Sequence, residues 1–206
     1  MKKYSVALSI LCAGIFFCFV TSAFTVKEVS TPLAEEVLRL HVLANSDSEN
    51  DQALKLKVKA AIVDAMSPVL SDTTDKSEAC AWVSDHLTQL QTIAENVIVS
   101  EGYTYPVTVA CETTWFPNRT YGDMTFPCGY YDALRVCIGD AEGANWWCVL
   151  YPPLCFVDLT CGVVPDESKE KLQTVLDEDD YNSLFSNDTQ IGVKFKLFEW
   201  LGELFS

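Results

Sequence analysis

The residues best suited to chemistry lie close together near position 45. His41, Ser46 and Asp47 are a base, a hydroxyl and an acid, which are the residue types of a seryl hydrolase. Such an enzyme also needs an oxyanion site, and no nucleophile-elbow motif accompanies these residues. The competing interpretation is helix capping, because Ser46 followed by Glu49 is a capping-box pattern. We prefer capping, and a secreted hydrolase that uses His41, Ser46 and Asp47 stays as the alternative.

The spacing of the remaining polar residues does not predict a metal or phosphate site. The chain has two histidines, His41 and His86, and no Cys-x-x-Cys or His-x-x-x-His pair, so we expect no structural zinc site. Gly139 and Gly143 do not form a phosphate loop, because the segment joins two predicted strands and no helix follows. We therefore expect no metal, no cofactor and no small-molecule substrate.

The overall charge limits the class of partner. Lys and Arg number 14 against 29 Asp and Glu, which gives a net charge of −15. Such a surface repels nucleic acid and anionic lipid headgroups. A protein with a basic surface is the natural partner, and we expect no binding to nucleic acid. With 49% hydrophobic residues the chain can bury a sizeable core.

The first 24 residues have the parts of an export signal. Lys2 and Lys3 precede an uncharged apolar run over residues 4–24, which ends with the small residues 21–23. The run is also long enough to span a bilayer, so residues 1–24 are a cleaved signal peptide or a retained membrane anchor. Either way the positive-inside rule places the rest outside the cytosol. Cleavage would remove both lysines and change the net charge from −15 to −17.

Hydrophobic periodicity predicts an α+β core domain over residues 33–164. Alternating apolar residues predict strands at Val37–Ala44, Tyr105–Cys111, Asp132–Ile138 and Trp146–Tyr151. The last two, on either side of a polar turn, look like a β-hairpin. Helical spacing predicts one helix from the capping box at Ser46 to Pro68, and another from about Ser77 to Ile98. The predicted fold is an antiparallel sheet, in the order strand, helix, helix, three strands, covered by two or three helices.

Residues 165–206 are expected to pack on this core as an acidic helical segment and an amphipathic C-terminal element. Glu167–Leu176 looks helical, and the four acids Asp177–Asp180 predict a solvated break. Val193–Phe205 fits a helix with one broad apolar face, or a short strand with a helical end. Packing on the domain is the preferred role for this element, and docking or contact with a membrane surface is the alternative.

The segment from Trp115 to Asp158 is the densest in aromatic residues, Gly, Pro and Cys. Phe116-Pro117 and Phe126-Pro127 flank Tyr121-Gly122, which predicts a tight, aromatic-lined excursion of the chain. The runs FPNRTYG, FPCGYYDALRVCIGD and GANWWCVLYPPLCFVD resemble the stage II sporulation protein R family. RLHVLANSDSENDQALKLKVK upstream and VKFKLFEW near the C-terminus extend the resemblance over most of the chain after residue 37.

The resemblance implies a bacterial signalling protein and not an enzyme. Members of this family are exported by the forming spore into the space between the forespore and mother-cell membranes. There they are sensed by a membrane-embedded aspartic peptidase, which then processes a sporulation sigma factor precursor of the sigma-E type. Cys128, Cys137 and Ala141 depart from the family pattern; at Ala141 we would expect Gly.

Cys148 and Cys155 are the best candidates for a disulfide. Both match the family block, and the Trp-Trp and Pro-Pro elements around them need a fixed path. An exported protein can keep such a bond, and a short loop should contribute about 2 kcal/mol. Cys80 and Cys111 are expected to be buried thiols, and the state of Cys128, Cys137 and Cys161 stays open.

Docking on the peptidase would use aromatic and Arg anchors, which dominate interface energetics. The anchors we expect are Arg119 and Tyr121 on the aromatic-lined excursion, Arg135 on the polar side of its strand, and Trp146 or Trp147 beside the predicted hairpin turn. Arg119→Ala and Tyr121→Ala should then leave thermal stability nearly intact and abolish peptidase activation. For Arg135 the alternative is an ion pair within this acidic domain. The loop with His41, Asn45 and Asp47 is the second surface to consider.

Overall fold

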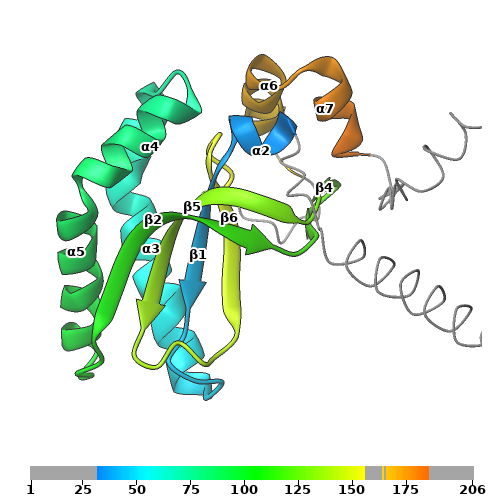
Figure 1. Cartoon of the computed structure of the whole chain (residues 1–206). Helices are drawn as coiled ribbons and strands as arrows, with labels where there is room; N and C mark the ends of the chain where they lie inside the picture. Colours follow the sequence, from blue (N-terminus) through cyan, green and yellow to red (C-terminus); the bar gives the residue numbers. More distant parts are fainter. Residues whose placement is uncertain (1–31, 156–163, 165, 186–206) are drawn as a thin grey trace, which may run out of the picture.

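Strand β1 (Leu38–Leu43) lies inside a four-stranded sheet of order β2-β5-β1-β6 in the computed structural model (Figure 1), which describes residues 32–155, 164 and 166–185. β1 runs parallel to β5 (Gly129–Ile138) and antiparallel to β6 (Asn145–Tyr151), and β2 (Val107–Phe116) is antiparallel to β5. The α+β class is confirmed, with a mostly antiparallel sheet. The predictions for the leader, Cys161 and Val193–Phe205 fall outside the described residues.

The predicted hairpin between the strands at Asp132–Ile138 and Trp146–Tyr151 is wrong. β1 lies between β5 and β6, and these two strands do not pair with each other. The long antiparallel pair is instead β2 with β5, which runs without a register shift from Val107↔Ile138 to Phe116↔Gly129. Alternation determines which face a side chain takes, but it does not name the neighbouring strand.

Helix α3 (Glu49–Asp72) differs from its prediction at both ends. Its N-cap is Ser48 and not Ser46, because the Ser48 hydroxyl accepts a hydrogen bond of 3.1 Å from the Asp51 amide. The helix also continues through Pro68, which we expected to stop it. Met66 and Leu70 on either side are buried in the core, and their burial offsets the roughly 3 kcal/mol cost of an interior proline.

The single helix predicted from Ser77 to Ile98 is two helices, α4 (Lys76–Asp85) and α5 (Leu87–Ser100). The break is at His86, whose backbone is not helical. Its Nδ1 donates to the Trp82 carbonyl at 2.7 Å, and the two rings stack with centroids 4.0 Å apart. This local side-chain hydrogen bond competes with continuation of the helix. Hydrophobic periodicity does not predict such a bond, so it could not predict the break.

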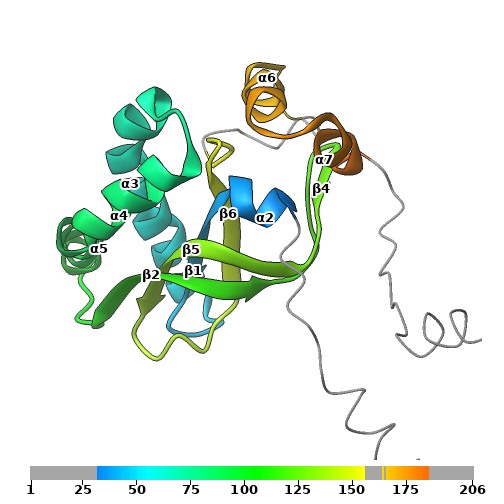
Figure 2. The same cartoon turned by 45° about the horizontal axis from the view of Figure 1, so that its top comes forward.

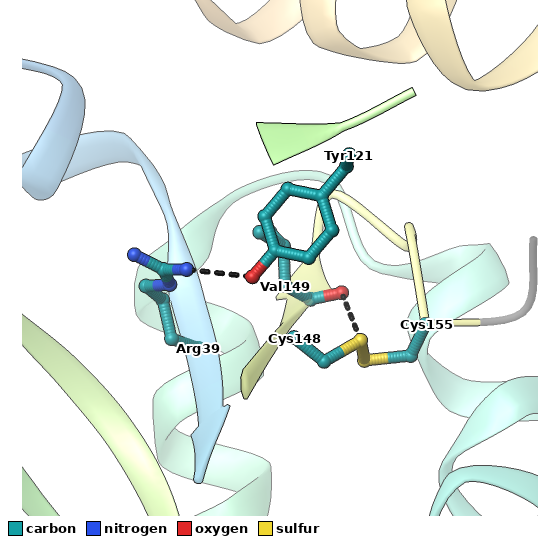
Figure 3. Close-up of a disulfide and its surroundings, with 5 residues drawn as sticks. All are labelled: Arg39, Tyr121, Cys148, Val149 and Cys155. Atoms are coloured by element: carbon teal, nitrogen blue, oxygen red, sulfur yellow. Dashed lines mark hydrogen bonds between the residues drawn. A yellow bond between two sulfur atoms is a disulfide. The ribbon is translucent and has the colours of Figure 1, made fainter. Parts of the chain in front are cut away.

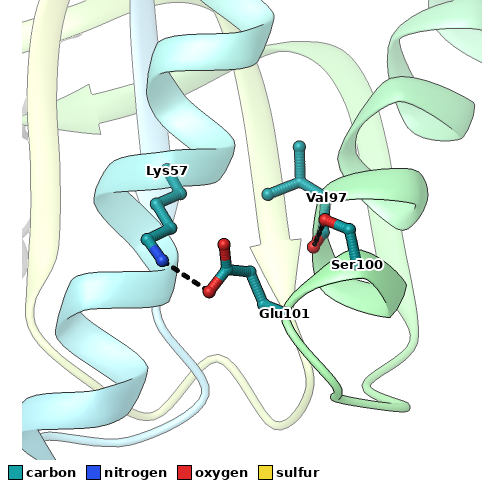
Figure 4. A network of polar contacts seen from close by, with 4 residues as sticks. All are labelled: Lys57, Val97, Ser100 and Glu101. Carbon is teal, nitrogen blue, oxygen red and sulfur yellow. Dashed lines mark hydrogen bonds and ion pairs between the residues drawn. The ribbon is translucent and has the colours of Figure 1, made fainter.

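Helices α3, α4 and α5 cover one face of the sheet and form the first core with it (Figure 1). Its members include Leu40 and Val42 of β1 with Val58, Ile62 and Leu90 of the helices. At the surface Lys57 of α3 contacts Glu101, which follows α5, and Ser100 donates to the Val97 carbonyl at 2.8 Å (Figure 4). An exposed pair of this kind contributes little stability, so the helices are held mainly by apolar burial.

Residues 113–132 form an arm that extends beyond the helices, as Figure 2 shows. The arm contains the end of β2, the hairpin of β3 (Arg119–Tyr121) and β4 (Met124–Phe126), and the start of β5. Gly122 makes the β3–β4 turn with φ 58°, a backbone angle that favours glycine. The predicted aromatic-lined excursion is therefore confirmed.

A second core lies between the arm, the other face of the sheet and three short helices, α2 (Pro32–Glu36), α6 (Asp166–Val175) and α7 (Glu178–Ser183). The solvated break predicted at Asp177–Asp180 is confirmed only at Asp177, the exposed N-cap between α6 and α7, because the three following acids begin α7. Negative side chains are favoured in the first turn of a helix by the helix dipole. No described helix has the length and apolar character needed to cross a membrane.

Candidate functional site

His41 is buried on the face of β1 opposite the long helices, with 6% of its surface exposed. Its ring stacks on Trp147 with centroids 3.8 Å apart, and Nε2 lies 2.8 Å from Asn145 Oδ1. Burial lowers the pKa of His41 to about 4, so the ring is neutral at pH 7. The Ser46 hydroxyl donates to Asp51 at 2.5 Å and not to His41. Among the described residues, the hydrolase arrangement of His41 with Ser46 is not assembled.

Asn45 and Asp47 join the β1–α3 loop to the connection between β5 and β6. Asn45 donates to Asp51 at 2.9 Å and accepts from the Asp140 amide at 3.0 Å. Asp47 accepts from the Ala144 amide at 2.6 Å. Hydrogen bonds from Ser46 and Asn45 lower the pKa of Asp51. These contacts give the loop a structural role, and its use as a recognition surface stays a prediction.

The two glycines of the β5–β6 connection are needed because the two loops approach so closely. A Cβ on Gly139 would lie 2.1 Å from Asn45 Oδ1, and one on Gly143 would lie 2.2 Å from the Ser46 carbonyl oxygen. Lys55 of α3, also buried, donates to the Ala144 carbonyl at 2.8 Å. Burial lowers the pKa of this lysine, and the charge of Asp47 opposes that shift.

The most unusual site residue is Arg39, whose side chain is fully buried in the second core. Its guanidinium carbon lies 4.1 Å from the ring centroid of Phe116 and 4.8 Å from that of Tyr131. Nη2 donates to the Tyr121 hydroxyl at 2.8 Å, and Figure 3 shows this bond beside the disulfide. The cation is therefore held by aromatic rings and a neutral phenol, and burial lowers the pKa of the guanidinium.

Four buried side-chain polar atoms have no hydrogen-bond partner among the described residues. They are Nε and Nη1 of Arg39, Nδ1 of His41 and Nε of Arg135. His41 and Arg135 are register partners across β1 and β5, so all four atoms lie on neighbouring strands. The alternation of β1 places Arg39 and His41 on this face, but no sequence signal indicated that the arm would bury Arg39.

The five anchor residues proposed from the sequence divide into two groups. Arg119 is exposed with its guanidinium carbon 5.7 Å from the Trp147 ring centroid, and Trp146 is partly exposed with Lys59 Nζ 4.9 Å from its ring centroid. Tyr121 is only 9% exposed and holds Arg39, so our expectation that Tyr121→Ala leaves stability intact is wrong. The alternative for Arg135 is confirmed, because its Nη1 pairs with Glu112 at 2.9 Å.

The predicted disulfide is confirmed. Cys148 of β6 and Cys155 are bonded, with Cα atoms 5.6 Å apart (Figure 3). Cys80 and Cys111 are half-buried thiols against the first core, and burial raises the pKa of both. Cys128 is an exposed thiol, and Cys137 is a half-buried one. The described residues contain no cluster of three or more His, Cys, Asp or Glu side chains that could hold a metal ion.

Comparison with known proteins identifies the family. The model of the stage II sporulation protein R family matches residues 34–161. Stage II sporulation protein R of Bacillus subtilis strain 168 is 34% identical over 189 residues, which cover 84% of each chain. No solved structure gives a significant match. The matched region includes the arm, the disulfide, the buried residues of the first core and most of those of the second core. The chain belongs to the stage II sporulation protein R family.

Proposed function

We propose that this protein is an exported signal of endospore formation that activates a membrane-embedded aspartic peptidase. The activated peptidase processes a sigma-E-type sigma factor precursor in the mother cell. Membership in a family of sporulation signalling proteins, which are not known enzymes, is the observation that carries the proposal. The signal therefore consists of a folded surface that the peptidase recognises, and the protein needs no substrate of its own.

The place of action is the space between the forespore and mother-cell membranes. The apolar run at residues 4–24 directs export, and the Cys148–Cys155 disulfide suits an oxidising compartment. A net charge of −15 disfavours adsorption to anionic lipid and favours a basic protein surface. The domain then reaches the peptidase by contact with its extracytoplasmic surface.

Arg119 and Trp147 are the anchors that the geometry supports on the arm side of the sheet. Arg119 projects from the arm and stacks over Trp147, which limits its rotamers before any partner arrives. Such preorganisation reduces the entropy lost on binding. Trp146, with Lys59 of α3 beside it, lies on the opposite face of β6 and is a separate candidate anchor. Arg135 is a weaker candidate because Glu112 already pairs with it.

The test is co-expression of the full chain with its peptidase and the sigma factor precursor in a bacterium that does not sporulate. Processing of the precursor is expected only when all three proteins are present. Arg119→Ala should reduce processing at least tenfold, because the stacked guanidinium is lost from the docking surface. Lys57→Ala, which removes an exposed cation from α3 on the other side of the sheet, is the matched control and should keep processing within twofold.

Two outcomes would count against the proposal. Processing that is equally efficient without this chain would show that the peptidase needs no such signal. Normal processing with Arg119→Ala, with wild-type levels of folded protein, would move the docking surface to the loop of His41, Asn45 and Asp47.

A further inference from the structure

Strand β2 forms an open edge of the sheet. Its ten residues pair with β5 on one side, and no described strand pairs with it on the other. The strand contains no Pro, Gly or Lys, and its register with β5 has no shift. Natural edge strands usually carry such features, because a long regular edge can pair with another chain.

The main-chain groups that face this open edge can be assigned from one hydrogen bond. The Gly139 amide donates to the Pro106 carbonyl at 2.8 Å, and these residues extend the β2–β5 register by one position. Hydrogen-bonded and non-hydrogen-bonded pairs alternate in an antiparallel ladder. The odd-numbered residues from Val107 to Trp115 therefore direct their amides and carbonyls outward, and the even-numbered residues direct theirs toward β5.

The opposite edge of the same sheet is protected. The register of β6 with β1 shifts at Leu38 and Arg39, and the chain after β6 folds back onto the strand. The amides of Leu154 and Cys155 both donate to the Val149 carbonyl at 3.1 Å, and the disulfide from Cys148 to Cys155 fixes this return (Figure 3). The contrast singles out β2 as the edge that is available for pairing.

Two exposed aromatic side chains mark the arm end of this edge. Trp115 of β2 is 49% exposed and Tyr130 of β5 is 39% exposed, and they are register partners. Trp115 belongs to the non-hydrogen-bonded set, in which opposing side chains stand closest. They therefore form one continuous apolar surface beside the outward amides. Neither side chain belongs to the two cores, so internal packing does not account for them.

We propose that β2 receives an extended segment of the extracytoplasmic part of the peptidase as an added fifth strand. This inference rests on the proposed function and names the surface that performs it. The added segment is expected to be basic, because the chain carries a net charge of −15, and to place an apolar side chain on Trp115 and Tyr130. Self-pairing through β2 would instead bring two such acidic copies together, which electrostatic repulsion disfavours. Only two residues separate the end of β2 from β3, which begins with Arg119, so the Arg119 anchor follows the arm end of the edge along the chain.

The test compares Thr113→Pro with Thr113→Ala in the full chain. Thr113 is an outward-facing residue of β2, so proline removes one amide from the open edge and no hydrogen bond to β5. Alanine removes the side-chain bond from Thr113 to Asp132, which measures 2.7 Å, and keeps the amide. Co-expression with the peptidase and its substrate should give processing within twofold of wild type for Thr113→Ala and at least tenfold less for Thr113→Pro. Melting temperatures of the two purified variants provide the comparison of folding.

A second pair of variants tests the aromatic surface without changing the backbone. Trp115→Thr should reduce processing at least tenfold, whereas Val99→Thr, which changes a still more exposed apolar residue on α5, should not. Hydrogen exchange of the wild-type complex in detergent supplies a readout that does not depend on a variant. The amides of Cys111, Thr113 and Trp115 should exchange at least tenfold more slowly with the peptidase present.

The outcomes separate this inference from the proposed function. If wild-type chain fails to support processing, the proposed function fails. If wild type supports processing and a folded Thr113→Pro variant does so equally, the strand-addition inference is overturned and the proposed function stands. Unchanged exchange of the three amides in the complex would overturn it too. A wild-type dimer that Thr113→Pro converts to a monomer would show that a second copy, and not the peptidase, occupies the edge.

Discussion

At the scale of single residues, the buried guanidinium of Arg39 depends most strongly on its surroundings, and Tyr121 supplies its hydrogen-bond acceptor. A buried cation without a carboxylate depends on every polar contact that it has, because an unpaired buried charge is strongly destabilising. Nη2 of Arg39 has the Tyr121 hydroxyl as its acceptor, while Nε and Nη1 have no partner among the described residues. The aromatic rings of Phe116 and Tyr131 supply the remaining stabilisation.

Tyr121→Phe is expected to lower the free energy of unfolding by about 1.5–3 kcal/mol, the usual range for a hydrogen bond to a charged group. The ring stays and only the hydroxyl is removed, so packing changes little. Urea unfolding at pH 7 measures the effect. Thr120→Val, an exposed change in the same short strand, is the control, and equal stability of wild type and Tyr121→Phe would show that the phenol does not hold the guanidinium.

His41 should make stability depend on pH. Its pKa in the folded protein is about 4, below the ordinary value of 6.5, so the unfolded chain binds the proton first as the pH falls. Stability is therefore lost between pH 6.5 and pH 4, by about 3 kcal/mol at roughly 1.4 kcal/mol per pKa unit. In His41→Phe, which keeps an aromatic ring against Trp147, this part of the dependence should be absent when urea unfolding is compared at pH 7 and pH 4. Parallel curves for the two proteins would contradict the assignment.

At the scale of elements, the link between the β1–α3 loop and the β5–β6 connection contains one strained residue. Ala141 has φ 54°, in the left-handed region that disfavours residues with a Cβ. Ala141→Gly should raise the free energy of unfolding by about 0.5–1 kcal/mol, because relief of this strain exceeds the entropy cost of glycine. Thermal unfolding of Ala141→Gly beside Ala144→Gly, where φ is not positive, checks this. Stabilisation by both variants, or by neither, would reject the explanation.

The disulfide protects the β6 edge as well as closing a loop. Replacing both Cys148 and Cys155 with Ala should lower the free energy of unfolding by about 2 kcal/mol, because the unfolded chain gains freedom. Hydrogen exchange should also increase at Leu154 and Cys155, whose amides now bond to Val149. Unchanged exchange at these positions would mean that the return of the chain does not depend on the bond.

The elements themselves were largely predictable from periodicity, whereas their pairing was not. The alternation of Leu38, Leu40 and Val42 predicts β1 and its core face correctly. The same alternation cannot show that β1 inserts between β5 and β6, because a strand pattern is satisfied by any neighbour. The Ser48 cap and the break at His86 each depend on one hydrogen bond. A hydrophobic pattern does not predict such bonds.

The candidate site was predictable only in part, for a related reason. The Cys148–Cys155 bond fits an expectation that came with the family resemblance, whereas the contact of Arg119 with Trp147 was not predicted. The burial of Arg39 and Tyr121 depends on the arm curling over the sheet, which is a tertiary contact across 82 residues of sequence separation. Isolated polar residues on a strand are usually exposed, so composition favoured the wrong interpretation of Tyr121.

In the whole molecule, the two cores are formed by different elements and should respond differently to substitutions. The first core contains the long helices and the covered sheet face, while the second holds the arm that carries Arg119 and the open end of β2. We therefore assign stability mainly to the first core and propose that recognition uses the arm and the open edge of β2. These parts would then meet the peptidase on the side of the membrane opposite the sigma factor precursor.

The most direct test of this central claim is reconstitution of the peptidase in lipid vesicles with the sigma factor precursor on its cytosolic side. Purified protein is then added to the extracytoplasmic side or, in a parallel sample, enclosed with the precursor. We predict that the precursor is processed when the protein and precursor are on opposite sides, and that it remains intact when both are on the cytosolic side. Processing only when both share the cytosolic side, or none in either sample although the peptidase is folded and oriented, would contradict the account.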